Sequence, residues 1–362
     1  MVEFRNLYQG RARYVTGVGT VDNSDPSRPI LAPDKDIGPI PRPDRGFNWS
    51  GAQRIDRMIE YFGKEADLET DDNAPMEVDI IGFSRGAANA RDFANQIVAA
   101  TDSNGLYHYK DAQGKEKCQK VHFRFMGLWD TVLSTNWSGH NYNLDIPKPF
   151  AYVAQAVALN EFRGHTRPDG RPDPHNWDTW GAFPLESIGP SSNTPGQVRV
   201  ERGFLGAHAD IGGGFGKNEN DLAKVALAWM VQQAVKAGVT VNVPSLTISA
   251  NPVLHDKSTN IQTGRPLTDS STEDRVVRYA DGTKTTQRKM KDIGMTYADT
   301  DRFIKYTPRE QLERNNYPRP DADGNMVDHY EYMTNQTGKV DVAGYLEWLG
   351  KNNYDLGNLT VQ

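Results

Sequence analysis

The chain has 362 residues, a formal net charge of −6 and one cysteine. A single cysteine excludes a framework of internal disulfides, and the acidic balance argues against general nucleic-acid binding, which needs a basic face. No apolar run reaches the roughly 18 residues of a membrane span, and the first fifteen residues lack the apolar core of a signal peptide. A hydrophobic content of 37%, with 33 glycines and 21 prolines, predicts a modest core with long loops.

The first elements along the chain are a short strand, a loop and a helix. Residues 12–15 favour a strand, and residues 21–46 hold six prolines and favour an irregular loop. Apolar side chains at i, i+3, i+4 and i+7 over residues 55–62 predict an amphipathic helix.

A strand, a tight turn and a helix are predicted next. Residues 78–83 are almost wholly apolar, as in a strand that is buried on both faces. Residues 84–100 carry alanines and other small apolar side chains on one face, which predicts a helix. A second strand is predicted over residues 121–127, and the spacing of apolar residues predicts a helix over residues 150–162.

The third strand and its helix follow a long loop. Residues 164–197 carry six prolines together with Trp177, Trp180 and Phe183. A loop of this kind over a sheet often forms a lid, and ordinary surface packing of these aromatic residues is the alternative. A strand is predicted over residues 198–205 and a helix over residues 221–236. Helices that alternate with strands predict a mostly parallel sheet covered on both faces.

The last hundred residues have a different character. A hairpin is predicted over residues 276–286, a helix start with a capping box at residues 307–310, and a short helix over residues 341–350. We therefore expect a catalytic domain over residues 1–250 and a loop-rich C-terminal extension over residues 251–362.

The segment Gly82-Phe83-Ser84-Arg85-Gly86 fits the pattern G-x-S-x-G between a predicted strand and a predicted helix. This pattern is typical of the nucleophile elbow of α/β-hydrolases, where a serine sits on a sharp, strained turn. We expect both glycines to be needed because bulky side chains would collide there. The turn presents the Ser84 hydroxyl and lets the Arg85 N–H donate to an oxyanion. An ordinary glycine–serine turn is the alternative.

A nucleophilic serine needs a base and an acid that orients the base. His208 follows a predicted strand and precedes a glycine-rich segment, so it is the favoured base, with His255 as the alternative. Asp130 ends a predicted strand and is the favoured acid, with Asp210 as the alternative. The order Ser84, Asp130, His208 is the order that α/β-hydrolases use.

Motifs for metals, phosphates and dinucleotides are incomplete. Ile211 stands where a P-loop needs glycine, and the chain has neither H-E-x-x-H nor paired cysteines for zinc. Residues 321–324 resemble the start of a calcium loop but lack its downstream ligands. Residues 17–19 lack the rest of a dinucleotide fingerprint. We expect a reaction that requires no metal and no other cofactor.

Taken together, the motifs resemble a known family. The elbow segment Gly82–Arg91 resembles that of a bacterial α/β-hydrolase domain found in type VI secretion phospholipase effectors. Further segments resemble that family in the same order: Tyr14–Thr20 (YVTGVGT), Gly127–Val132 (GLWDTV), Ala158–Arg163 (ALNEFR) and Gly206–Phe215 (GAHADIGGGF). The resemblance implies that Ser84 is the nucleophile, Asp130 the acid and His208 the base.

The resemblance also implies a function. It predicts a phospholipase A-type antibacterial effector that hydrolyses phospholipids or other lipid esters. Such an effector is cytoplasmic in the producing cell, is exported by a type VI system without a signal peptide, and has a secretion-system or immunity protein as partner. The alternative is a non-catalytic module of the same fold that binds lipid or a secretion partner.

The family implies an α/β-hydrolase-like fold with one departure. Family members usually begin with a strand that ends in Asp-Gly-Thr, and too few residues precede the Gly-Val-Gly-Thr turn at residues 17–20 to contain it. We expect this strand to be missing or replaced by a different segment. The extension over residues 251–362 is expected to act as a lid or a partner-binding segment.

Overall fold

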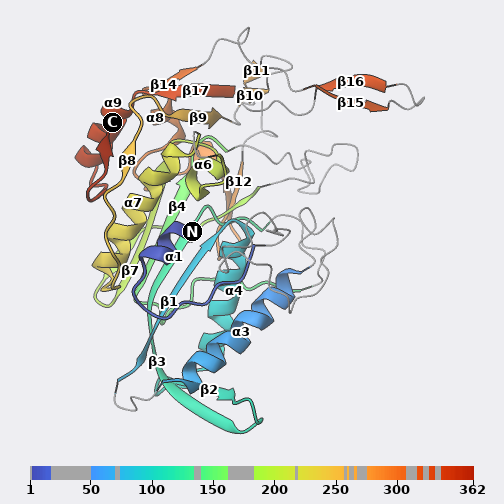
Figure 1. The fold of residues 1–362 in the computed structure, drawn as a ribbon, viewed down its shortest axis with the longest axis vertical. Coiled ribbons are helices and arrows are strands. Elements are labelled where there is room, and N and C mark those ends of the chain that lie inside the picture. Colours follow the sequence, from blue (N-terminus) through green and yellow to red (C-terminus); the bar gives the residue numbers. More distant parts are fainter. Residues whose placement is uncertain are drawn as a thin grey trace.

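The computed structural model of the chain centres on a mainly parallel sheet with helices on both faces (Figure 1). This arrangement confirms the predicted α/β class. The structure describes residues 2–17, 50–69, 74–133, 140–161, 183–216, 219–256, 259–260, 265–266, 275–306, 316–320, 326–330 and 336–362. No helix in these ranges is both long and apolar enough to cross a membrane.

The central sheet brings three strand ends to one edge. Its parallel strands, in spatial order, are β1 (Met76–Phe83), β3 (Glu116–Trp129), β4 (Tyr152–Ala158) and β7 (Gln197–Phe204). Two antiparallel strands extend it, β2 (Leu106–Lys110) beside β3 and β6 (Ser192–Thr194) beside β7. Ser84 directly follows β1, Asp130 follows β3 and His208 follows β7. The carboxyl ends of parallel strands are where α/β proteins gather their functional residues.

Each face of the sheet has its own hydrophobic core. The helices α3 (Gly51–Asp67) and α4 (Arg85–Ala99) cover one face, and α1 (Val2–Leu7) and α7 (Asp221–Lys236) cover the other (Figure 1). Along β1, Val78 and Ile80 enter the first core while Ile81 and Phe83 pack against the second. This alternation is the period of two in a strand, and it explains why residues 78–83 are apolar almost throughout.

A helix is predicted over residues 150–162, but the described part of this range contains the strand β4, Tyr152–Ala158, instead. All residues of β4 after Tyr152 are buried, because β3 and β7 flank the strand and helices cover both faces. A continuous apolar run such as AYVAQAVAL satisfies helical spacing and strand burial equally well, so its periodicity cannot tell the two apart.

Residues 12–15, predicted as a strand, form none. Side chains rather than strand pairing hold this segment, since Arg11 and Arg13 form ion pairs with Glu65 of α3. Among the described residues β1 pairs only with β3. The N-terminal segment therefore lies near the other edge of β1 without extending the sheet.

Strands that follow residue 250 pair with strands that precede it in the sequence. The strand β12 (Val276–Arg278) pairs with β13 (Lys284–Thr286) in the predicted hairpin and also with β5 (Leu185–Glu186). The strand β18 (Thr360–Val361) pairs with β8 (Thr247–Ile248). The remaining elements are α6 (His208–Gly212), β9 (Val253–Asp256), β10 (Thr259–Asn260), β11 (Arg265–Pro266), η2 (Gln287–Lys289), α8 (Tyr297–Thr300), β14 (Ile304–Tyr306), β15 (Asn316–Pro320), β16 (Met326–Tyr330), β17 (Gln336–Val340) and α9 (Val342–Lys351). The division at residue 250 stays a prediction.

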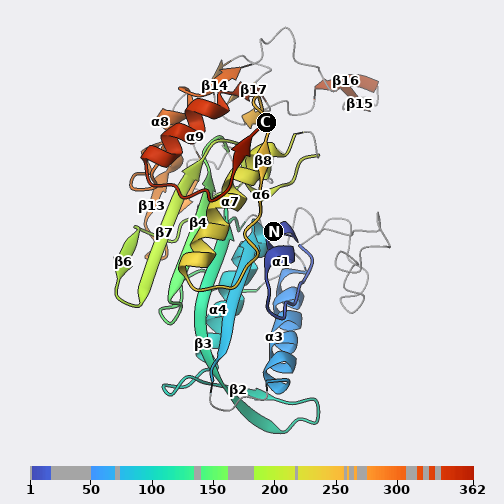
Figure 2. The same ribbon diagram turned by 60° about the vertical axis from the view of Figure 1, so that its left-hand side comes forward.

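The predicted C-terminal helix is confirmed as α9. The Asp341 carboxylate caps it by accepting from the Gly344 N–H at 3.1 Å, which satisfies one donor of the first turn. The helix lies on the β7 side of the sheet (Figure 2), where the Leu205 N–H donates to the Tyr345 hydroxyl at 3.2 Å. The helix α9 therefore packs against the end of β7, the strand that precedes His208.

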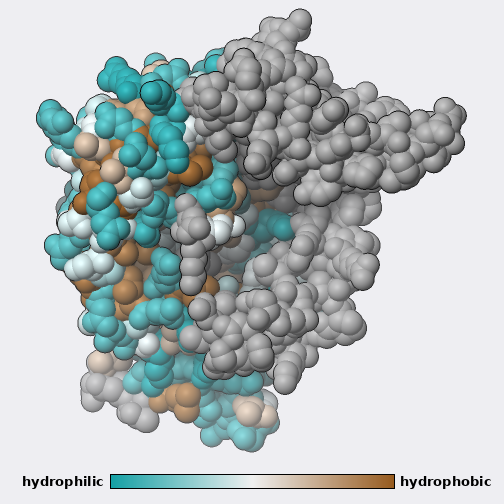
Figure 3. All heavy atoms as spheres, turned by 45° about the horizontal axis from the view of Figure 1, so that its top comes forward, coloured by the Kyte–Doolittle hydropathy of each residue, from teal (hydrophilic) through white to brown (hydrophobic). Residues whose placement is uncertain are grey.

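Four of the predicted features lie outside the described residues. They are the irregular loop at residues 21–46, the lid tryptophans Trp177 and Trp180, the capping box at residues 307–310, and the calcium-like segment at residues 321–324. On the face drawn in Figure 3, hydrophilic residues are interspersed with smaller hydrophobic patches.

Candidate active site

Ser84 sits on a one-residue turn between β1 and α4. Its backbone angles, φ 59° and ψ −131°, lie in a region that costs a residue other than glycine about 1–3 kcal/mol. A Cβ at Gly82 would lie 2.5 Å from the Ala87 Cα, so glycine is required there, as predicted. A Cβ at Gly86 would meet no described atom within 4 Å, so the described residues give no steric reason for that glycine.

The turn that carries Ser84 is bonded to the turn that carries Asp130. The Ser84 N–H donates to the Trp129 carbonyl at 3.0 Å, and the Val132 N–H donates to the Ser84 carbonyl at 3.3 Å. Asp130 also has a positive φ, of 43°. Two strained turns on neighbouring strands are thus held together by main-chain hydrogen bonds.

His208 begins the short helix α6, and its ring is held by a carboxylate and two aromatic rings. The Nδ1 atom lies 2.6 Å from Asp130 Oδ2. Phe83 stacks on the ring at a centroid distance of 4.5 Å, and Phe183 meets it edge-on at 4.9 Å. Since Phe83 immediately precedes Ser84, this stacking brings the imidazole to the elbow.

The carboxylate determines which nitrogen of His208 carries the proton. An ionised carboxylate can only accept hydrogen bonds, so Nδ1 of the neutral ring is the donor and Nε2 carries the lone pair. A lone pair on Nε2 is what a base needs to take a proton from a hydroxyl.

Asp130 is fully buried and ionised. Burial would raise its pKa, but the charges and hydrogen bonds of Arg275 and His208 outweigh burial and hold the pKa of Asp130 below its ordinary value. Arg275 binds both carboxylate oxygens, each at 2.8 Å. Arg275 is not among the site residues predicted from the sequence, because an arginine that precedes two valines at the start of a predicted hairpin carries no signal of burial.

A second carboxylate supports the backbone of the base. The His208 N–H donates to Glu161 Oε2 at 3.2 Å, and Glu161 is buried just beyond β4. Glu161 belongs to the segment ALNEFR that carried part of the family resemblance. A carboxylate at the start of α6 also suits the positive end of a helix dipole.

Arg85 is the first residue of α4. N–H groups in the first turn of a helix point out of its N-terminus, where they favour a negative charge. The Arg85 N–H is therefore suited to an oxyanion that forms on a carbonyl attacked by Ser84.

Part of the chain, which includes Asp130 and His208, matches a known family model. Residues 92–233 match the family model described as the catalytic domain of Tle1-like phospholipase effectors of the type VI secretion system. The predicted family resemblance is confirmed over this Tle1-like segment. The segment contains Asp130 and His208, whereas Ser84 and Arg275 lie outside it.

Two solved structures match part of the chain. One is a crystal structure of an uncharacterized protein from Pseudomonas aeruginosa, 22% identical over 53% of this chain and 28% of that chain, with a TM-score of 0.32. Another is the Tle1 effector bound to the VgrG spike of a type 6 secretion system, 18% identical over 54% of each chain, with a TM-score of 0.37. This chain thus matches about a quarter and about half the length of these two proteins. No curated protein matches the chain.

The alternative base, His255, and the alternative acid, Asp210, pair with each other. His255 Nδ1 lies 2.9 Å from Asp210 Oδ1, and Asp210 Oδ2 accepts from the backbone N–H groups of Ala207 and His255. Burial raises the pKa of Asp210, although these hydrogen bonds oppose the rise. Phe215 stacks on the His255 ring at 3.5 Å. This second pair fixes the loop that carries His208.

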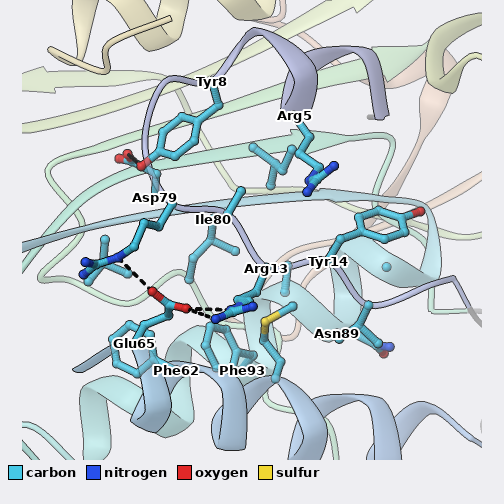
Figure 4. Close-up of a pocket in the computed structure, with 18 of the residues that line it drawn as sticks. Arg5, Tyr8, Arg13, Tyr14, Phe62, Glu65, Asp79, Ile80, Asn89 and Phe93 are labelled. Atoms are coloured by element: carbon cyan, nitrogen blue, oxygen red, sulfur yellow. Dashed lines mark hydrogen bonds and ion pairs between the residues drawn. The ribbon is translucent and has the colours of Figure 1, made fainter. Parts of the chain in front are cut away.

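A cavity of about 610 Å³ lies beside the elbow, between the N-terminal segment, α3, β1 and α4 (Figure 4). Phe62, Ile80 and Phe93 give it apolar walls, and Arg13 and Glu65 form an ion pair at its polar end. The cavity reaches Phe83 and Gly86, on either side of Ser84, but Ser84, Asp130 and His208 do not line it. The cavity therefore lies next to the elbow, on the side of β1 that faces the N-terminal segment.

Proposed function

We propose that the protein is a serine ester hydrolase that cleaves lipid esters with Ser84, His208 and Asp130. The observation that carries the proposal is the 2.6 Å contact between His208 Nδ1 and Asp130 Oδ2, beside the strained turn of Ser84. A nucleophile, a base and an orienting acid at one edge of a sheet form the arrangement that ester hydrolysis requires.

In the proposed acylation step, Ser84 Oγ attacks the acyl carbonyl of the lipid while His208 Nε2 takes the hydroxyl proton. The carbonyl oxygen becomes an oxyanion, and the Arg85 N–H donates to it. When the tetrahedral intermediate collapses, the bond from the acyl carbon to the ester oxygen breaks, and His208 gives its proton to the departing alcohol. An acyl group then remains on Ser84.

In the deacylation step, His208 takes a proton from a water molecule, which attacks the acyl-serine. Collapse of the second intermediate releases a fatty acid and returns the proton to Ser84 Oγ. Asp130 stays ionised throughout, since its lowered pKa keeps the proton on the imidazole. Its charge stabilises the imidazolium that forms in both steps.

The match of residues 92–233 to a phospholipase effector domain supports a phospholipid as the substrate. Cleavage of an acyl ester, as in a phospholipase A, follows from the serine mechanism. We further propose that a type VI system exports the protein from the cytoplasm of the producing cell without a signal peptide. Its partners would then be a component of that system and an immunity protein.

Release of fatty acid from phospholipid vesicles tests the proposal. The purified chain should release fatty acid, and Ser84→Ala should lower the rate by about 10³-fold or more, because the members of a triad act as a unit. Phospholipids labelled in the 1-acyl or the 2-acyl chain show which ester is cut. Binding of the vesicles without Ser84-dependent release would instead favour the non-catalytic module.

A further inference from the structure

Arg275 makes a two-pronged contact with Asp130 from outside the Tle1-like segment. Its Nη1 donates to Asp130 Oδ1 and its Nη2 to Oδ2, both at 2.8 Å. Both side chains are 0% exposed. The two residues are 145 positions apart in the sequence, and Arg275 lies directly before β12.

The guanidinium is itself held in place on its other sides. Its Nε donates to the Phe183 carbonyl at 2.6 Å, and Nη1 also donates to Gln287 Oε1 at 3.2 Å. The Gln287 amide in turn donates to the carbonyls of Ala158 and Leu159, at the end of β4. Arg275 is therefore oriented before it meets the carboxylate, and the planar fork of an arginine makes that orientation specific.

These contacts leave Asp130 with no freedom to turn. A carboxylate offers about four lone-pair positions. Oδ1 accepts from Arg275 Nη1 and from the Ala158 N–H at 3.0 Å, and Oδ2 accepts from Arg275 Nη2 and His208 Nδ1. The three hydrogen bonds from Arg275 and Ala158 therefore fix the direction in which Asp130 Oδ2 faces His208 Nδ1.

The charge of Arg275 has a second effect on the same site. An isolated buried carboxylate would strongly favour a protonated imidazole beside it. Here Arg275 offsets part of the Asp130 charge, and its Nη2 shares Oδ2 with His208. Glu161, whose Oε2 accepts from the His208 backbone N–H, is a second buried carboxylate beside the base. The pair of Arg275 and Asp130 thus orients the imidazole without tying it to its charged form.

We propose that Arg275 is a positioning residue for the triad: it fixes the Asp130 carboxylate toward His208 and offsets the carboxylate charge, so that His208 is a neutral base at rest. This inference rests on the proposed function. Arg275 belongs to the predicted C-terminal extension. The extension therefore contributes a residue to the active site.

The test uses two substitutions that separate geometry from charge. Arg275→Lys keeps the charge but loses the two-pronged contact, and Arg275→Gln loses both. Arg278→Gln is the matched control, since Arg278 lies on β12 and pairs with Glu186 at 3.2 Å without touching Asp130. The readouts are kcat per folded molecule, with the folded fraction measured by circular dichroism, KM, and the pH profile of kcat/KM on a short soluble ester.

We expect Arg275→Gln to lower kcat by about 10- to 100-fold with little change in KM, because a small misplacement of the base suffices for that loss. The acid limb of the kcat/KM profile should move up by about one pH unit, since removal of a nearby cation favours the imidazolium. Arg275→Lys should lower kcat while its acid limb stays at the wild-type pH. Arg278→Gln should match the wild type in both readouts.

Two results would overturn the inference. One is an Arg275→Gln protein with the wild-type kcat per folded molecule or an unmoved acid limb. The other, decisive even if Arg275→Gln does not fold, is an Arg275→Lys protein with the wild-type kcat. Failure of the proposed function is seen separately, as a wild-type protein whose ester hydrolysis is unaffected by Ser84→Ala.

Discussion

Phe83 and His208 stack with their ring centroids 4.5 Å apart and their planes 30° from parallel. This contact joins the residue before the proposed nucleophile to the proposed base. It is possible because Gly212, in the glycine-rich segment after His208, leaves room for the Phe83 ring. A Cβ at Gly212 would lie 2.0 Å from a carbon of that ring.

Gly212→Ala should therefore lower activity by displacing Phe83 from the His208 ring. We expect kcat on a soluble ester to fall by at least about tenfold and the unfolding free energy to drop by about 1–3 kcal/mol, as for an overpacked core. Gly216→Ala is the control, because a Cβ there meets no described atom within 4 Å. Equal effects of the two substitutions on kcat would show that the stacking does not matter for catalysis.

The strain at Ser84 predicts an unusual order of stabilities. Glycine adopts φ 59° and ψ −131° readily, whereas alanine keeps the strain. In urea unfolding, the unfolding free energy of Ser84→Gly should thus exceed that of Ser84→Ala. The expected difference is about 1 kcal/mol after the extra chain entropy of glycine is deducted. At Ser249, an exposed serine whose φ is not positive, the order should be reversed. The same order at both positions would argue against strain at the elbow.

The two histidine–carboxylate pairs should respond differently to substitution. His208→Gln should lower kcat by about 10³-fold or more with the protein folded. His255→Gln should lower the unfolding free energy by about 1–3 kcal/mol, because Asp210 loses a buried partner, and should leave kcat per folded molecule within a few-fold of the wild type. The opposite outcome, in which only His255→Gln abolishes turnover, would exchange their roles.

Asp130 should make stability depend on acid pH. Its pKa is lowered in the folded protein, so the folded state binds fewer protons there than the unfolded state. Its contribution is fully present above the ordinary value near pH 4 and is lost as the pH falls through the folded value. Asp130→Asn should be less stable than the wild type by about 3–5 kcal/mol at pH 7, since Arg275 loses its partner.

The difference between wild type and Asp130→Asn should shrink steadily below about pH 4. Urea unfolding at a series of pH values from 7 to 3 measures it, with Asp145→Asn as the control for an exposed carboxyl. A difference that stays constant over this range would mean that folding does not lower the pKa of Asp130.

Local patterns predicted much of the parallel sheet and the position of each proposed triad residue. The strands predicted at residues 78–83, 121–127 and 198–205 correspond to β1, β3 and β7, and the helices predicted at residues 55–62, 84–100 and 221–236 to α3, α4 and α7. These elements have clear apolar periodicity or apolar runs. The roles of Ser84, Asp130 and His208 stay predictions, although the structure brings Asp130 and His208 together.

What the sequence did not predict depends on contacts between distant residues. Tyr152–Ala158 form a strand because two neighbouring strands enclose them, which their own spacing does not reveal. Arg275 reaches Asp130 across 145 positions, and His255 meets Asp210 across 45. Local propensity carries no information on such pairs, so the sequence favoured His208 as the base by its position but left His255 as the alternative.

Covalent labelling with a fluorophosphonate shows whether Ser84 is an activated nucleophile, because this probe reacts with a serine only when a base activates it. We expect the purified chain to be labelled on the peptide containing Ser84, and Ser84→Ala and His208→Gln to remove the label while His255→Gln keeps it. A folded wild-type protein that takes no label, or takes it on another serine, would exclude Ser84 as the nucleophile.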